Sequence, residues 1–227
     1  NNTIADTPAM VCPLLLFNRH SHTPLFCFLT CLITKFTLPL HTKKHKRINM
    51  AKRNIAVVLA GGVGKRLGIT TPKQFFKVAG KMVIEHTVDV FERNNHIHEI
   101  AIVSNAMLIA DIENIVLKNG WTKVKRILKG GSERYESSLS AIKAYENEDV
   151  NLIFHDAVRP LVSHRILNDV VEALKNYSAI DVAMPSADTI IEVEGEFISN
   201  IPDRSRLRRG QTPQAFDLNV IKEAYEK

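Results

Sequence analysis

Short apolar runs alternate with amphipathic segments from Ile55 onward, and this alternation restricts the chain to an α/β fold. Five apolar runs of four to six residues are predicted strands: residues 55–59, 99–103, 124–128, 152–155 and 179–184. Helical spacing of apolar side chains predicts helices at residues 82–93, 106–119, 136–145 and 165–175. Strands that alternate with helices are typical of parallel sheets covered by crossover helices. We therefore predict one three-layer α/β sandwich with a mostly parallel, Rossmann-like sheet.

The first 49 residues differ in composition from the rest and precede Met50, which we interpret as the natural start. They carry six Lys or Arg against one acid, and they contain all three cysteines. Residues 50–227 are therefore nearly neutral and free of cysteine, which gives no support for a nucleic-acid partner and is compatible with a cytoplasmic location. The apolar stretch at residues 24–34 is shorter than the roughly 20 residues of a membrane helix. We expect residues 1–49 to be a non-native or disordered leader, and we expect no membrane attachment.

A glycine-rich turn follows the first predicted strand. The glycines within residues 61–64 would let backbone N–H groups approach an anion, and Arg66 and Lys73 would supply positive charge. The dinucleotide-binding fingerprint needs a glycine where Leu67 stands, and the P-loop needs Ser or Thr in place of Arg66. Taken alone, the turn is either a phosphate cradle or a purely structural turn.

Further polar clusters follow the later strands, at residues 130–134, 155–160 and 186–189. The carboxyl ends of parallel strands meet at one rim of a sheet, which is where open α/β sheets bind ligands. We interpret His155, and His86 on a predicted helix, as packing residues rather than catalytic bases. Asp156 at this rim is a candidate binding residue, with a turn cap as its structural alternative.

The pattern changes after residue 189 to two short alternating pieces, at residues 189–193 and 196–201. The turn between them at residues 194–195 predicts a β-hairpin that projects from the sheet. The arginine-rich stretch at residues 202–214 follows. It is either a solvated loop or a contact to a phosphate or a partner subunit, because arginines are costly to bury unpaired.

Several separated motifs now match one family. They are residues 60–66 (AGGVGKR), 72–74 (PKQ), 130–134 (GGSER), 155–160 (HDAVRP), 203–204 (DR) and 211–214 (QTPQ). In order and spacing, the chain from Met50 onward resembles the cytidylyltransferases that activate polyol phosphates, a family with a nucleotidyltransferase sheet and a projecting β-arm. The leader has no counterpart in this family, and the family continues beyond the position of Lys227, so the domain at residues 50–227 looks truncated.

The resemblance implies transfer of a cytidylyl group from CTP to a polyol phosphate, with release of pyrophosphate. The motifs at residues 201–204 and 210–214 are more similar to the D-ribitol 5-phosphate enzymes, which make CDP-ribitol for surface polysaccharides. The alternative substrate is 2-C-methyl-D-erythritol 4-phosphate, used in isoprenoid synthesis. Two other classes stay open: an NAD(P)-dependent oxidoreductase and a non-catalytic nucleotide-binding subunit.

The resemblance also implies a role for each matching residue. Arg66 and Lys73 would stabilise the transition state. The expected nucleotide-binding residues are Ala60, Gly61, Gly62, Gly64, Lys65, Gly131, Ser132 and Ser137. The expected substrate-binding residues are Asp156, Arg159, Thr189 and Arg204, of which Asp156 is also the candidate nearest a metal. The implied cofactor is Mg²⁺, and the implied partners are a second copy joined through residues 189–214 and a fused reductase domain beyond Lys227.

Overall fold

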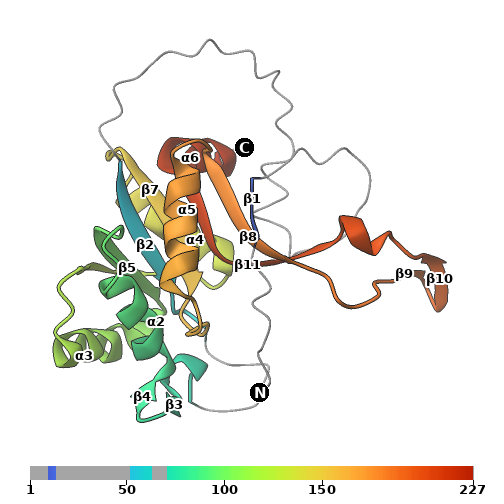
Figure 1. The fold of residues 1–227 in the computed structure, drawn as a ribbon. Coiled ribbons are helices and arrows are strands. Elements are labelled where there is room, and N and C mark those ends of the chain that lie inside the picture. Colours follow the sequence, from blue (N-terminus) through green and yellow to red (C-terminus); the bar gives the residue numbers. More distant parts are fainter. Residues whose placement is uncertain (1–9, 14–51, 63–70, 227) are drawn as a thin grey trace, which may run out of the picture.

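The computed structural model describes residues 10–13, 52–62 and 71–226. Within these ranges the centre of the molecule is a seven-stranded sheet in the order β1-β8-β11-β7-β2-β5-β6 (Figure 1). Its strands are β1 Met10–Pro13, β2 Arg53–Leu59, β5 Glu99–Ser104, β6 Val124–Lys129, β7 Val150–Asp156, β8 Ala179–Pro185 and β11 Arg208–Asp217. The five predicted strands are all present.

Most of the sheet is parallel, as the sequence predicts. Strand β2 pairs in parallel with β5 and β7, and β5 pairs in parallel with β6. Strand β11 differs, because it lies between β7 and β8 and runs antiparallel to both, and β1 at the sheet edge runs antiparallel to β8. For residues 202–214 the sequence left open a solvated loop or a contact and predicted no strand, whereas the structure has a strand from Arg208 onward. Gly210 and Pro213 are residue types that are disfavoured inside strands, so the sequence pattern does not indicate one here. The register of β11 with β8 shifts between Gly210 and Gln214.

Helices cover both faces of the sheet and complete the predicted three layers (Figure 1). They are α2 Val83–Glu92, α3 Ile109–Asn119, α4 Arg134–Ala144, α5 His164–Leu174 and α6 Leu218–Tyr225. Helices α2, α3 and α5 contribute to one buried apolar cluster, and α4 and α6 contribute to the other. Along β2, Ala56 and Val58 belong to the first cluster while Ile55 and Val57 belong to the second. This alternation buries β2 on both faces, as expected of a continuous apolar run.

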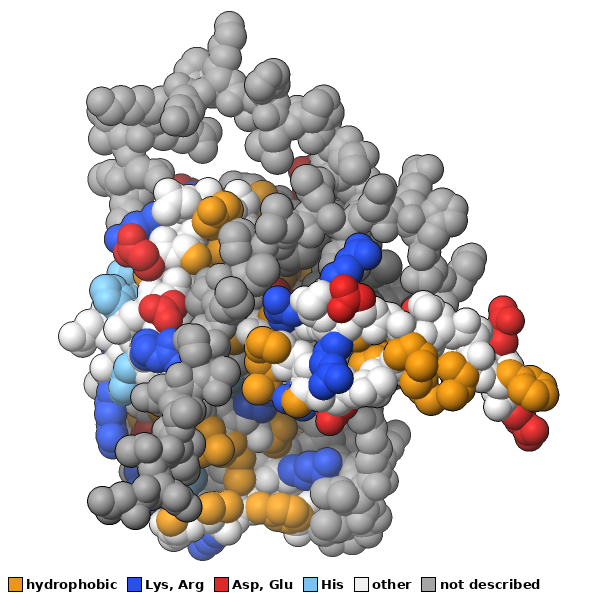
Figure 2. Space-filling model, turned by 45° about the vertical axis from the view of Figure 1, so that its right-hand side comes forward, with side chains coloured by type: hydrophobic (Ala, Val, Ile, Leu, Met, Phe, Trp, Pro, Cys, Tyr) orange, Lys and Arg blue, Asp and Glu red, His pale blue; other side chains and the backbone are white. Residues whose placement is uncertain are grey.

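Strands β9 Glu192–Glu194 and β10 Phe197–Asn200 form an antiparallel hairpin. Gly195 turns the chain between them with φ of +60°, a conformation that glycine adopts at no steric cost. The hairpin stands away from the sheet on two extended connections (Figure 1), so the predicted projecting arm is confirmed. We call residues 186–207 the arm. Its apolar side chains lie exposed along its length (Figure 2), with Phe197 80% exposed.

The remaining elements are short. They are η2 Lys73–Phe75, β3 Lys77–Val78, β4 Lys81–Met82, η3 Ala106–Leu108 and η4 Arg204–Arg206. Strand β1, which comes from the leader, pairs antiparallel with the outer edge of β8, with Met10 opposite Ala183. This strand is not among those predicted from the sequence. Among the described helices, none has the length and apolar character needed to cross a bilayer.

Candidate functional site

The first part of the site is the end of β2, where the glycine turn begins. The Ala60 amide donates to the carbonyl of Val103, at 2.7 Å, and this bond fixes the chain beside β5. Among the described residues, a Cβ added to Gly62 would meet no atom within 4 Å, so this part of the protein does not itself require a glycine there. Gly64, Lys65 and Arg66, which the sequence predicts as phosphate-contacting residues, lie outside the described residues.

The η2 turn carries Lys73 and is fastened to the same point. Its central residue, Gln74, is 1% exposed and donates from Nε2 to the carbonyl oxygen of Ala60, at 2.8 Å. The Ser104 hydroxyl donates to the same oxygen at the longer distance of 3.4 Å. Lys73 is half-buried, and its ammonium has no ion pair or hydrogen bond within the described part of the chain. The buried amide of Gln74 therefore links the predicted catalytic lysine to the base of the glycine turn.

The loop at residues 130–137 packs against this base. A Cβ on Gly61 would lie 3.8 Å from the Ser137 Oγ, so the two predicted nucleotide-binding segments are neighbours. A Cβ on Gly130 would come within 2.6 Å of that oxygen, and one on Gly131 within 2.3 Å of Glu136 Cβ. Real Cβ atoms do not make such short contacts. The two glycines are thus required by the packing of the loop.

Glu136 occupies the first turn of α4. Its carboxylate accepts from the amide of Glu133, at 3.1 Å, and from both the amide and the hydroxyl of Ser132, at 2.6 and 2.8 Å. These hydrogen bonds, of which that from the Glu133 amide is the strongest influence, lower the pKa of Glu136. The Ser132 hydroxyl, predicted to contact the base, is engaged by Glu136. The buried Ser137 hydroxyl donates to the carbonyl of Glu133, at 3.2 Å.

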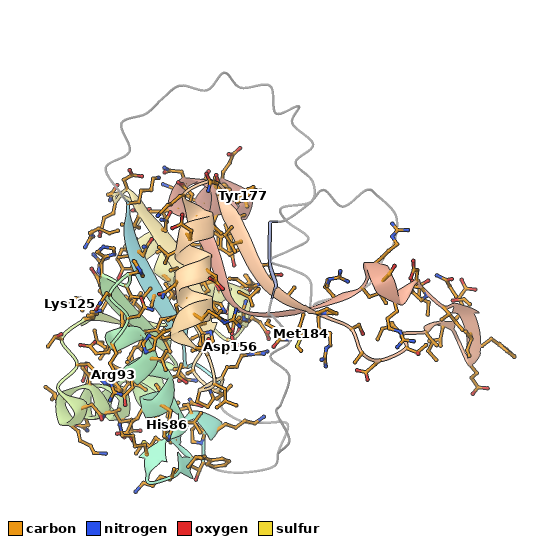
Figure 3. The ribbon with its side chains drawn as sticks, in the orientation of Figure 1. His86, Arg93, Lys125, Asp156, Tyr177 and Met184 are labelled. Carbon is orange, nitrogen blue, oxygen red and sulfur yellow. The ribbon has the colours of Figure 1, made fainter. Side chains whose placement is uncertain are left out.

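Asp156, at the end of β7 and labelled in Figure 3, pairs with two arginines. Arg159 donates from Nε to Oδ2 at 2.8 Å, and Nε of Arg134 pairs with Oδ1 at 3.5 Å. Each guanidinium also reaches a glutamine of β11. Arg159 Nη1 donates to Gln211 Oε1 at 3.0 Å, and Arg134 Nη2 donates to Gln214 Oε1 at 3.3 Å. We call these five residues the arginine cluster.

The arginine cluster bears on the predicted metal role of Asp156. Both carboxylate oxygens are directed to guanidinium groups, and a cation between two arginines would be repelled. In the described part of the chain, no group of three or more His, Cys, Asp or Glu side chains could hold a metal ion. Asp156 in this arrangement therefore does not fit a direct metal ligand.

His155 is buried, as predicted, and packs at 5.2 Å from the ring of Phe91. Burial lowers its pKa to about 4, so the imidazole is neutral at pH 7. A carbonyl can only accept, so its Nε2 donates to the carbonyl of Arg159, at 3.0 Å. This hydrogen bond joins His155 to the loop that carries Arg159. His86 likewise makes a structural contact, from Nε2 to the carbonyl of Val78 at 2.7 Å.

Thr189 and Arg204 are placed apart from these groups. Both are exposed on the arm, and Arg204 donates from Nη1 to the carbonyl of Ala187, at 3.1 Å. No hydrogen bond or ion pair among the described residues joins either one to Asp156. A single copy of the chain therefore does not bring Thr189 and Arg204 to Asp156, as their predicted role in substrate binding would require.

Three members of the arginine cluster have no role predicted from the sequence. Arg134, Gln211 and Gln214 all lie within the family motifs at residues 130–134 and 211–214. Gln214 also donates to Asp181 of β8 at 3.2 Å. Burial raises the pKa of Asp181, and the Gln214 hydrogen bond and Arg134 oppose that rise. These residues come together only when β11 pairs with β7, and the sequence has no local signal for that pairing.

A mostly parallel α/β sheet whose loops gather polar and cationic side chains at the carboxyl ends of its strands is the arrangement of a nucleotide-binding protein. A family model described as 2-C-methyl-D-erythritol 4-phosphate cytidylyltransferase (IspD) matches residues 54–227. The chain belongs to this cytidylyltransferase family. The resemblance seen in the sequence is thereby confirmed, and the nicotinamide alternative loses its support.

Individual relatives have two different printed functions. The chain is 48% identical over 178 residues to a bifunctional ribulose 5-phosphate reductase/CDP-ribitol pyrophosphorylase of Haemophilus influenzae, covering 77% of this chain and 38% of that protein. It is 41% identical over 197 residues to a 2-C-methyl-D-erythritol 4-phosphate cytidylyltransferase of Thermobifida fusca, covering 84% and 78%. A ribitol-5-phosphate cytidylyltransferase of Lactiplantibacillus plantarum is 33% identical over 75% of this chain and 76% of its own.

Solved structures agree with the fold. The crystal structure of 4-diphosphocytidyl-2C-methyl-D-erythritol synthase from Anaerococcus prevotii superposes with a TM-score of 0.67 at 26% identity, over 78% of each chain. The chain spans little more than a third of the length of its Haemophilus relative, so the activity of the whole protein is a matter for proposal.

Proposed function

We propose that this chain transfers a cytidylyl group from CTP to D-ribitol 5-phosphate, giving CDP-ribitol and pyrophosphate. The observation that carries the proposal is that the described start of the glycine turn, the Lys73 turn fastened to it through Gln74, and the arginine cluster lie at the carboxyl ends of the neighbouring strands β2 and β7. Family membership supports CTP as the donor. The 48% identity to a protein named as a CDP-ribitol pyrophosphorylase supports ribitol phosphate as the acceptor.

The chemistry needs no nucleophile from the protein. An oxygen of the substrate phosphate attacks the α-phosphorus of CTP, and the bond from that phosphorus to the bridging oxygen of the β-phosphate breaks. The electron pair of this bond leaves with pyrophosphate. The protein contributes alignment and neutralises the charge that builds on the phosphoryl oxygens. We assign that neutralisation to Lys73 and Arg66, and the nucleotide contacts to the segments at residues 60–65 and 131–137.

2-C-methyl-D-erythritol 4-phosphate is the second candidate acceptor. The family description and the Thermobifida relative, aligned over 84% of this chain, favour it. Both candidates are phosphate monoesters of short polyols, so the same arginines could hold either one. The difference between them lies in the carbon skeleton.

The deciding experiment measures pyrophosphate release from CTP with each polyol phosphate in turn, in the presence of Mg²⁺. We expect the kcat/KM for ribitol 5-phosphate to exceed that for methylerythritol phosphate by at least tenfold. The reverse ratio would transfer the assignment to the second substrate. Absence of release with both would refute cytidylyl transfer by this chain.

We propose Mg²⁺ as the metal, carried by the phosphates of CTP rather than by a carboxylate centre of the protein. Phosphate oxygens and retained waters are the ligands that Mg²⁺ prefers, and the arginine pairing of Asp156 supports this division. Omission of the metal from the release assay should abolish turnover. Persistent turnover in the presence of a chelator would contradict the proposal.

We also propose a homodimer formed through residues 189–214, a cytoplasmic location and, beyond Lys227, a fused reductase domain. Exposed apolar side chains on both strands of the hairpin support the dimer, and Figure 2 shows them together on the arm. In such a dimer, Thr189 and Arg204 could serve the site of the partner subunit. The absence of cysteine after Met50 supports the location, and the bifunctional relative supports the reductase.

A further inference from the structure

Arg134 has a position in the arginine cluster that closely parallels that of Arg159. The two guanidinium groups share one carboxylate, with Asp156 Oδ1 paired to Arg134 and Oδ2 to Arg159. Their side chains are similarly exposed, at 42% and 44%, while that of Asp156 is 24% exposed. Asp156 therefore acts as a spacer that holds two cations beside each other at the open rim.

Strand β11 completes the arrangement from the other side. Gln211 accepts from Arg159 and Gln214 accepts from Arg134, so each guanidinium is held at two points. A guanidinium has five N–H donors. Within the described residues, Nη1 of Arg134 and Nη2 of Arg159 have no protein acceptor. Each arginine is thus fixed in place and still has donors to offer to a ligand.

The charge of the cluster also indicates an anion. Within the arginine cluster itself, the two guanidinium groups against the one carboxylate of Asp156 leave one net positive charge. A phosphate monoester carries close to two negative charges at pH 7 and three acceptor oxygens. Two adjacent guanidinium groups match such a group in charge and in donor geometry.

We infer that Arg134 is a further substrate-binding residue, which holds the phosphate of the polyol substrate together with Arg159. Asp156, Gln211 and Gln214 are then positioning residues that set the spacing of the two arginines. The inference rests on the proposed function, because it takes the polyol phosphate as the ligand of this rim. It deepens that function by assigning to Arg134 a role that the sequence motif alone did not reveal.

The test compares Arg134→Gln and Arg134→Lys with a matched control, Arg165→Gln, whose side chain is 57% exposed and paired with Asp169 on α5. Isothermal titration measures ribitol 5-phosphate binding to the full chain with CMP present, since CMP fills the nucleotide site and has no pyrophosphate to release. Loss of a charge-assisted hydrogen-bonding group should weaken binding by roughly 10- to 100-fold in Arg134→Gln. Arg134→Lys should fall between, because it keeps the charge and loses the fork. The control variant Arg165→Gln should bind ribitol 5-phosphate with unchanged affinity. The affinity for unphosphorylated ribitol should be the same in Arg134→Gln and the unaltered chain.

Steady-state kinetics of pyrophosphate release give a second measurement, the KM for each substrate. A purely structural role of Arg134 would not change the KM for one substrate selectively. We expect the KM for the polyol phosphate to rise in Arg134→Gln while the KM for CTP changes less than twofold. A rise in the KM for CTP alone would overturn the inference and move Arg134 to the triphosphate. Unchanged affinity in both variants, or no binding of ribitol 5-phosphate by the unaltered chain, would also overturn it. Binding without pyrophosphate release would refute the proposed function, and the affinity ratio would still decide the role of Arg134.

Discussion

Gln74 offers a direct test of how the lysine turn is held. The substitution Gln74→Met keeps the length and shape of the side chain and removes its donor. In the structure that donor lies 2.8 Å from the Ala60 oxygen, and the residue is 1% exposed. Among the described residues, the carbonyl would then retain the Ser104 hydroxyl alone, at 3.4 Å, which is a weak hydrogen bond at that length.

The size of the effect follows from the burial of both groups. Leaving a buried carbonyl poorly satisfied costs about 1 to 3 kcal/mol of unfolding free energy. In a domain of this length, each kcal/mol lowers the melting temperature by about 2 to 4 °C. We therefore expect a melting temperature lower by roughly 2 to 12 °C. The free energy of unfolding from chemical denaturation should fall by the matching amount.

Activity should fall further than stability explains. Lys73 precedes Gln74 directly, so a released turn would misplace the ammonium, and misplacement by about 1 Å can cost on the order of 100-fold in rate. Pyrophosphate release is measured well below the new melting temperature, so that unfolding does not contribute. Ser104→Ala is the matched control, because it removes the weaker bond to the same oxygen. Equal kcat in Gln74→Met and the unaltered chain would refute the positioning role of Gln74.

Three other predictions concern separate parts of the molecule. Lys73→Ala should lower kcat by roughly 10²- to 10³-fold with native circular dichroism, and unchanged kcat would refute its role in the transition state. Burial alone would raise the pKa of Glu85, but hydrogen bonds from Asn119, the Met82 amide and Lys118 lower it to about 2. The resulting stabilisation, about 3 kcal/mol, is present above pH 5 and is lost as the pH falls toward 2, so the stability deficit of Glu85→Gln in urea titrations should shrink over that range. A deficit independent of pH would contradict this assignment. Phe197→Asp should dissociate a dimer in sedimentation experiments while Leu117→Asp, at a residue of similar exposure on α3, should not; equal behaviour would argue against the arm as the interface.

The sequence predicts the regular strands and helices well, because a strand that is buried on both faces is a continuous run of apolar residues. The run at residues 55–59 is apolar at every position, and in the structure its side chains divide between the two apolar clusters. The start of helix α5 also has a local signal, because Ser163 is a favourable N-cap residue. Its hydroxyl accepts a hydrogen bond from the Ile166 amide. These signals are local, so one sequence is enough to read them.

Strand β11 shows where local signals fail. Its first residues are exposed and polar, and its buried positions begin only at Pro213, Ala215 and Phe216. A proline and a glycine within the run argue against a strand by ordinary propensity. The strand exists because β7 and β8 leave room for an antiparallel neighbour between them, and pairing on both sides outweighs the poor local preference. That outcome depends on tertiary structure that the sequence pattern does not encode locally.

The role of Asp156 depends on that same strand. From the sequence, Asp156 is either a substrate-binding residue near a metal, as the family resemblance implies, or a turn cap. The insertion of β11 next to β7 brings Gln211 and Gln214 to the rim, and these residues hold Arg159 and Arg134 against the carboxylate. A carboxylate that pairs with a guanidinium on each oxygen holds the two arginines in position and is not suited to bind a metal cation. The arm continues directly into β11, so whatever holds the arm in place also bears on the spacing of the two arginines. The hairpin of the proposed dimer contact and the two glutamines of the arginine cluster therefore lie on one stretch of chain, and the cluster itself forms only when β11 pairs with β7.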